Sequence, residues 1–85
     1  MKVSYDEEVD VLTITLSPAP VADSDEVQPG VIFDYDSAGN TIAIELLDAS
    51  GRVDNPYSLS YNYAKGSANM PGESEAASAV PSPLG

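Results

Sequence analysis

Residues 31–47 of this chain have the sequence VIFDYDSAGNTIAIELL. Apolar side chains occupy alternate positions in both halves, which is typical of β-strands that bury one face. The polar residues 37–40, SAGN, include a glycine and suit a tight turn. The segment therefore predicts a β-hairpin with arms 31–36 and 41–47. Three apolar residues of one arm match three of the other: Val31, Phe33 and Tyr35 with Ile42, Ile44 and Leu46.

The same alternation continues toward the N-terminus and predicts two further strands, at residues 2–6 and 9–16, joined by a turn at Glu7 and Glu8. On each strand the apolar residues share one face, namely Val3 with Tyr5, and Leu12 with Ile14 and Leu16. The prolines of the following SPAP, residues 17–20, end the second strand because proline has no N–H to donate to a ladder.

The acidic residues 21–27 predict an edge strand, since charged side chains discourage pairing between sheet edges. A turn at QPG, residues 28–30, leads from it into the hairpin. The expected fold class is therefore all-β, a small antiparallel meander sheet of about five to six strands with a flexible C-terminal tail. We expect an acidic antiparallel β domain at residues 1–51, a tyrosine-rich segment at 52–65, and a tail at 66–85 that is disordered or ordered by a partner.

Charge narrows the classes of partner. The chain has 85 residues, with 14 acidic side chains against three basic ones and a formal net charge of −11. Such a field repels nucleic acids and anionic membranes and attracts basic proteins or cations. We therefore expect no direct nucleic-acid binding, and a basic protein as partner. The alternative is that the charge only keeps a small protein soluble.

Small size limits how this chain is stabilised, because a domain of this length buries a modest fraction of its surface. It contains no cysteine and no histidine, so a disulfide framework is excluded and structural zinc is disfavoured. Homo-oligomerisation or a bound partner is the stabilising device left. The N-terminus has no signal-peptide pattern and no apolar run is long enough for a membrane span, so we expect a cytoplasmic protein.

Residues 57–63, YSLSYNY, alternate apolar and polar side chains. They predict a sixth strand or a docking segment, because tyrosine combines a large apolar ring with a hydroxyl that stays hydrated, as at interfaces. The predicted partner-binding residues are Tyr57, Leu59, Tyr61 and Tyr63. The alternative is that these side chains only cover the sheet of their own domain.

Three blocks in order, residues 5–16 (YDEEVDVLTITL), 27–36 (VQPGVIFDYD) and 44–50 (IELLDAS) with Gly39 between the last two, resemble the small bacterial proteins grouped as domain of unknown function 2283. The resemblance covers about residues 2–50. It implies a short β-rich domain without an established activity, and the small operons that often encode members suggest an antitoxin-like partner protein. After Ser50 the chain departs from the family pattern, and GRVDNP, residues 51–56, predicts that no helix follows.

Acidic residues near the hairpin turn raise the possibility of a cation site. Residues 34–45 partly match an EF-hand loop, but Ala38 offers no ligand at the fifth position and no helices flank the loop. Pairing Asp36 with Thr41 would also place Glu45 roughly 13 Å away along the strand, too far to share one ion with Asp36. The interpretation is a glycine turn, with a weak surface cation site at Asp34, Asp36 and Glu45 as the alternative.

Catalysis is not expected, because the sequence has no histidine or cysteine and no glycine-rich phosphate loop. A sheet this small also offers little material to enclose paired carboxyls around a substrate. We therefore expect no enzyme activity and no cofactor. The leading hypothesis is a non-enzymatic interaction module that binds a basic protein, as an accessory subunit or an antitoxin-like neutraliser. Weak divalent-cation binding is the alternative.

Overall fold

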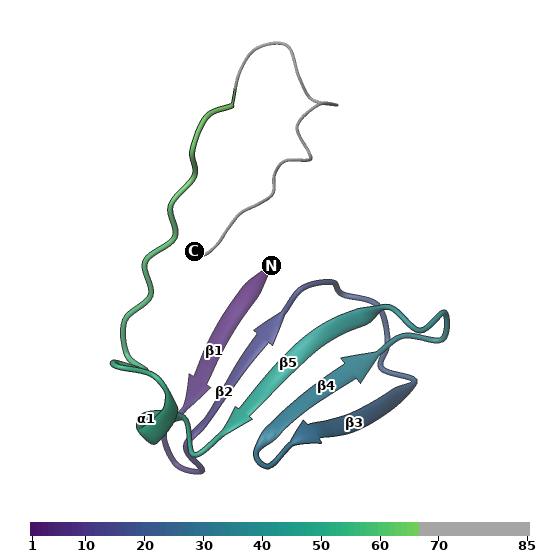
Figure 1. The fold of residues 1–85 in the computed structure, drawn as a ribbon, viewed down its shortest axis with the longest axis horizontal. Helices are drawn as coiled ribbons and strands as arrows, with labels where there is room; N and C mark the ends of the chain where they lie inside the picture. The colour runs from purple at the N-terminus through teal and green to yellow at the C-terminus, as the bar shows by residue number, and fades with distance from the viewer. Residues whose placement is uncertain (67–85) are drawn as a thin grey trace.

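The computed structural model describes residues 1–66 and shows one antiparallel sheet of five strands (Figure 1). The strands are β1 (Lys2–Asp6), β2 (Val11–Thr15), β3 (Asp23–Gln28), β4 (Val31–Tyr35) and β5 (Thr41–Leu47). A single helical turn, α1 (Ala49–Arg52), follows β5. The predicted all-β antiparallel class is confirmed. Apart from Gly66, the tail predicted at residues 66–85 lies outside the described residues.

The strand order across the sheet is β1-β2-β5-β4-β3. Strands β3, β4 and β5 form a meander, whereas β2 lies beside β5 and the chain crosses from one side of the sheet to the other between β2 and β3. After β2, the backbone N–H groups of Leu16 and Ser17 both donate to the Ile42 carbonyl, at 2.7 and 3.2 Å. The prolines after Ser17 keep this crossing out of the ladder. The edges of the sheet are therefore β1 and β3, and the predicted edge position of the acidic strand is confirmed.

Directly paired residues lie on the same face of a sheet, and the register places two apolar rows on one face. One row is Val3, Ile14, Ile44 and Phe33; the other is Tyr5, Leu12, Leu46 and Val31. We call these eight residues the apolar face. Seven of them are only half-buried, because no second layer of structure covers the sheet within residues 1–66.

The core is small and is divided between the inner strands β4 and β5 and the helical turn α1. The buried apolar residues are Val31, Ile42, Ala43 and Ala49, and no large side chain in the described part of the chain is completely buried. A domain ordinarily packs two layers around its core, and this one has a single layer. The sheet therefore has little apolar burial with which to stabilise itself.

The second arm of the β4–β5 hairpin has its predicted bounds, whereas the first ends at Tyr35 rather than Asp36 and the register differs near the turn. Phe33 pairs with Ile44 as expected, whereas Thr41 pairs with Tyr35 rather than Asp36, and a bulge displaces Ile42. The Asp36 carboxylate is the cause, because it accepts the backbone N–H groups of Ala38 and Asn40, both at 2.9 Å, and so begins the turn one residue early.

The helical turn α1 corrects the expectation that no helix follows Ser50. Asp10 anchors its start: the carboxylate accepts the Ser50 backbone N–H at 2.9 Å and hydroxyl at 2.7 Å, and the Asp10 carbonyl accepts the Ala49 N–H at 3.0 Å. Arg52 anchors its end by donating to the carbonyls of Leu47 and Pro29, both at 2.6 Å. These contacts fix where the chain leaves the sheet.

Residues 57–63 do not form the sixth strand that was one of the two predictions for them. They are extended and unpaired, and Figure 1 shows this segment running from α1 past the N-terminal end of β1. Alternation makes a segment competent to pair with a strand edge, but the turn at Asn55 and Pro56 directs it away from β1.

Candidate interaction surface

Residues 57–63, which we call the tyrosine arm, carry four of the nine large apolar side chains that are exposed in the described part of the chain. Four apolar side chains of the arm are exposed by 71, 70, 73 and 78%, namely Tyr57, Leu59, Tyr61 and Tyr63. The structure thus places the four predicted partner-binding residues on one segment, but it does not bring them onto their own sheet as a group. Tyrosines displayed in this way are typical of interface residues.

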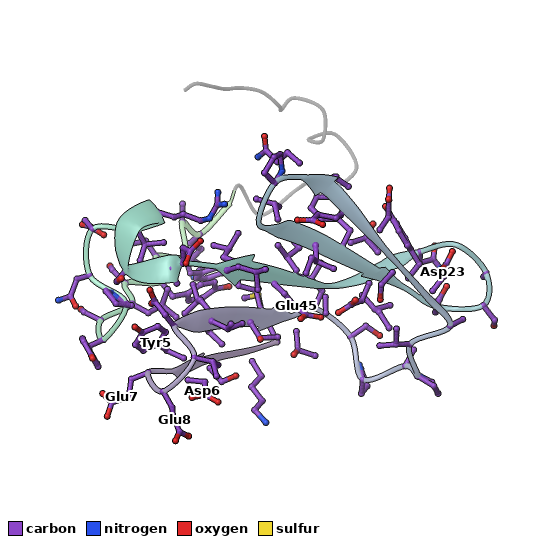
Figure 2. The ribbon with its side chains drawn as sticks, turned by 90° about the horizontal axis from the view of Figure 1, so that it is seen from below. Tyr5, Asp6, Glu7, Glu8, Asp23 and Glu45 are labelled. Atoms are coloured by element: carbon purple, nitrogen blue, oxygen red, sulfur yellow. The ribbon has the colours of Figure 1, made fainter. Side chains whose placement is uncertain are left out.

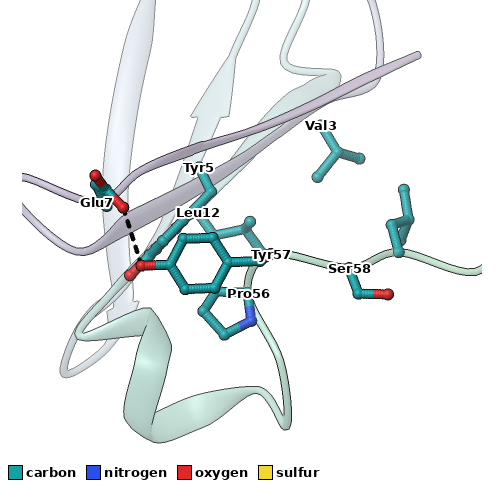
Figure 3. Close-up of a pocket in the computed structure, with 8 residues that line it drawn as sticks. Val3, Tyr5, Glu7, Leu12, Pro56, Tyr57 and Ser58 are labelled. Carbon is teal, nitrogen blue, oxygen red and sulfur yellow. Dashed lines mark hydrogen bonds between the residues drawn. The ribbon is translucent and has the colours of Figure 1, made fainter.

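A turn and an aromatic contact hold the base of the arm. The Asn55 side chain accepts the Tyr57 backbone N–H at 3.0 Å, and the Ser58 N–H donates to the Asn55 carbonyl at 3.2 Å. Tyr57 then meets Tyr5 of β1 edge to face, with ring centroids 5.2 Å apart and planes at 87°. Its hydroxyl donates to the Glu7 carboxylate at 3.0 Å (Figure 3), and this hydrogen bond raises the pKa of Tyr57.

Asp10 holds the tyrosine that receives the arm. The Tyr5 hydroxyl donates to the Asp10 carboxylate at 2.7 Å, which raises the pKa of Tyr5 to about 12. Hydrogen bonds from the side chain of Ser50, the hydroxyl of Tyr5 and the backbone of Ser50 lower the pKa of Asp10. Asp10 has a positive φ of 58°, a conformation that aspartate tolerates better than most residues. The β1–β2 turn, α1 and the base of the arm therefore form one connected unit.

An apolar groove lies between the base of the arm and the apolar face. It consists of two adjoining cavities of about 330 and 440 Å³, and Val3, Leu12, Pro56 and Leu59 line both. Tyr5, Glu7 and Tyr57 line the first cavity, whereas Val53, Asp54 and Asn55 line the second. The groove is open to solvent and is wide enough to receive apolar side chains from another chain.

Acidic groups occupy both ends of the sheet. Figure 2 shows Asp6, Glu7 and Glu8 at the β1–β2 turn and Asp23 at the opposite end of the molecule. Every residue of the edge strand β3 is exposed, including Asp23, Asp25 and Glu26. An exposed acidic edge discourages pairing with a like edge and favours contact with a basic partner.

Of the three predicted cation ligands, the structure brings two together. Asp34 is buried on the face opposite the apolar face and accepts the Ser24 hydroxyl at 2.6 Å. Hydrogen bonding to Asp34, burial and repulsion by Asp34 together raise the pKa of Glu45 to about 7. Asp36 does not join them, because Asn40 and the turn backbone engage its carboxylate and lower its pKa. Within residues 1–66 no group of three or more acidic side chains is arranged to hold a metal ion.

The part of the chain that forms the sheet matches a known protein family. A family model described as "Protein of unknown function (DUF2283)" matches residues 2–50, which include all five strands and more than half of the chain. The chain belongs to this family. The expected resemblance is thereby confirmed, and the DUF2283 match contains Tyr5, Asp10 and Ser50 but ends before Arg52 and the tyrosine arm. Comparison with curated proteins and with solved structures finds no match.

Sequence reasoning missed the residues that attach the arm. Asp10 belonged to a predicted strand, and neither Ser50 nor Tyr5 was singled out as its partner. The usable signal was local: Asp10 ends the acidic run DEEVD before a β-branched strand, where a positive φ suits a turn.

The only helix in residues 1–66 has four residues, so no described helix could cross a membrane.

Proposed function

We propose that this DUF2283 chain is a non-enzymatic interaction module that docks on another protein through the tyrosine arm. The observation that supports the proposal is the 70–78% exposure of four large apolar side chains on a segment anchored at its base. Exposed large apolar side chains exclude water when a partner covers them, and an anchored base lowers the entropy that is lost when the rest of the segment is ordered.

The acidic surface defines the class of partner. Residues 1–51 hold eleven acidic side chains and one basic one, so the sheet domain has a formal charge of −10. A basic protein would be attracted at long range and would neutralise the exposed carboxylates of β3. Two roles fit such a complex: accessory subunit of a larger assembly, or antitoxin-like neutraliser of a small basic toxin.

Affinity capture from the native host, followed by mass spectrometry, tests this proposal. The wild type is compared with Tyr61→Ser/Tyr63→Ser, which removes two rings, and with Tyr61→Phe/Tyr63→Phe, which keeps them. We expect the wild type and the phenylalanine variant to retain the same basic protein in near-stoichiometric amount, less of it at high salt, and the serine variant to lose it. An identical capture profile for all three chains would overturn the role of the arm.

Divalent-cation binding is the second candidate, and the pairing of Asp34 with Glu45 favours it because a cation would relieve their repulsion. Calcium titration followed by heteronuclear NMR tests this candidate. Specific binding predicts saturable shifts at Asp34 and Glu45 that Asp34→Asn abolishes, whereas diffuse screening predicts small, unsaturable shifts spread over the acidic surface.

A further inference from the structure

We infer that the tyrosine arm of one chain docks in the apolar groove of a second copy, so that two chains exchange arms reciprocally. The inference rests on the proposed function, in which the arm is a docking segment, and it names one partner of that segment. It concerns the purified chain alone.

The arm leaves its own sheet beyond its base. Only its base contacts the chain's own sheet, where Tyr57 meets Tyr5 and Leu59 borders the groove. Beyond that point Tyr61 and Tyr63 are exposed by 73 and 78%, and the chain runs past the end of its own sheet (Figure 1). The chain's own apolar face thus leaves both distal rings uncovered, and the apolar face of a second copy can receive them.

The receiving surface of the second copy is an apolar groove beside β1 and β2. The groove opens onto the half-buried apolar face, and its larger cavity of about 440 Å³ is lined by Val3, Leu12 and Val53 together with the base of the arm. Alternation places Tyr61 and Tyr63 on the same side of an extended chain, spaced to follow a strand. An arm laid along β1 and β2 of a second copy would therefore direct both rings toward these residues.

The area that two exchanged arms would bury reaches the lower range of specific interfaces. A tyrosine buries about 150–250 Å², so at exposures of 73 and 78% Tyr61 and Tyr63 leave roughly 230–380 Å² uncovered per arm. Two arms and the comparable surface they cover amount to roughly 900–1,500 Å², which overlaps the lower range of specific interfaces at about 1,200–2,000 Å². One arm docked on a foreign surface would bury half of that.

The formal charges of the arm region and of the sheet domain have opposite signs. Residues 55–65 contain no acidic side chain and one basic one, Lys65, and so have a formal charge of +1 beside a sheet domain of −10. Docking sheet on sheet would bring the acidic surfaces of two copies together, whereas arm exchange places the uncharged or basic segment of each chain against the acidic body of the other. The charge pattern therefore favours the arm as the element exchanged.

Light scattering on the purified full chain, with size-exclusion separation, gives the first test. We expect a dimer for the wild type and for Tyr61→Phe/Tyr63→Phe, and a dissociation constant at least tenfold higher for Tyr61→Ser/Tyr63→Ser. A wild type that stays monomeric at millimolar concentration would overturn the inference. So would a serine variant that dimerises as tightly as the wild type, because another surface would then hold the copies together.

An equal mixture of isotope-labelled and unlabelled chains identifies the contact itself. Filtered NMR experiments should show nuclear Overhauser effects from the Tyr61 and Tyr63 rings of one copy to the Val3 and Leu12 methyl groups of the other. If these effects arise only within one chain, the arm folds back and the inference fails. Failure here with arm-dependent capture of a basic protein intact would leave the proposed function standing, whereas loss of both would remove both.

Discussion

Tyr5 of the first strand and Tyr57 at the base of the arm meet edge to face, with ring centroids 5.2 Å apart and planes at 87°. The Tyr5 hydroxyl donates to the Asp10 carboxylate and the Tyr57 hydroxyl donates to the Glu7 carboxylate. Each tyrosine is therefore held both by its hydroxyl and by its ring. The pair converts an extended C-terminal segment into one with a defined starting direction. Everything proposed for the arm depends on this anchor.

Tyr57→Ala is expected to detach the arm from β1, because the edge-to-face contact and the hydrogen bond to Glu7 are both lost. Tyr57→Phe keeps the ring and loses only the hydroxyl. In NMR spectra the ring-current shifts of the Tyr5 protons should disappear in the alanine variant and persist in the phenylalanine variant. Unchanged Tyr5 shifts in Tyr57→Ala would show that the two rings do not meet in solution.

The Asp10 carboxylate should titrate below its ordinary pKa of 3.8, because Ser50 and Tyr5 donate hydrogen bonds to its charged form. Ser50→Ala removes the largest of these contributions and should move the titration midpoint of Asp10 upward in carbonyl-detected NMR. Asp36, whose pKa Asn40 lowers, serves as an internal control that should not move. An unchanged Asp10 midpoint would show that the Ser50 hydroxyl does not donate to the Asp10 carboxylate.

The raised pKa of Glu45 predicts that the free energy of unfolding falls as the pH rises. Its pKa is raised from 4.5 to about 7 in the folded chain, so the folded state binds more protons than the unfolded state between these values. That stabilisation is complete below about pH 4.5 and is lost as the pH rises through about 7. We expect urea denaturation to give a free energy of unfolding lower by about 1–2 kcal/mol at pH 8 than at pH 5, after allowance for partial exposure.

Glu45→Gln should flatten this dependence, because the amide keeps its shape and does not titrate. Glu8→Gln, which changes an exposed carboxylate in the β1–β2 turn, is the matched control and should leave the slope as in the wild type. If Glu45→Gln keeps the wild-type dependence of stability on pH, another titrating group causes that dependence.

Substitutions at two glycines distinguish the cost of backbone strain from the cost of a steric contact with Arg52. Gly30 and Gly39 both have positive φ, 80° and 88°, but a methyl group would collide with the Arg52 guanidinium only at Gly30. Gly39→Ala should cost about 1–2 kcal/mol of unfolding free energy from strain alone. Gly30→Ala should cost roughly 1 kcal/mol more, because Arg52 must then give up its bond to the Pro29 carbonyl.

Thermal or urea denaturation measures both variants. In the background of Arg52→Ala the two glycine substitutions should cost nearly the same, since the contact that distinguishes them has been removed. An equal cost in the wild-type background would mean that Arg52 does not lie over the β3–β4 turn.

The strands were predictable where alternation and turn residues agree. Lys2–Asp6 and Thr41–Leu47 have their predicted bounds, and the acidic Asp23–Gln28 lies at an edge as expected. The position of β2 beside β5 could not be predicted, because the long SPAP connection leaves the pairing of non-consecutive strands undetermined. Ile42 is displaced because Asp36 caps its own turn. A pattern of alternating side chains does not reveal such a local hydrogen bond.

The sequence indicates which residues form the candidate site, but not how they are arranged. Alternating tyrosines indicated an interface segment, but the same pattern fits a strand, and only the turn at Asn55 distinguishes the two. The contact of Asp10 with Ser50 joins residues far apart in the chain, and no local pattern marks such a pair. The sequence predicted Asp34, Asp36 and Glu45 as one group of ligands, and the geometry of the turn is what separates Asp36 from the other two.

The central claim is that the distal rings of the arm serve recognition and not the stability of their own domain. Its most direct test is urea denaturation of Tyr61→Ser/Tyr63→Ser at a protein concentration where the wild type is monomeric. We predict a free energy of unfolding within about 0.5 kcal/mol of the wild type, as for exposed surface positions, together with the loss of arm-dependent binding. A loss of several kcal/mol in the isolated monomer would show instead that the arm is part of the domain's core.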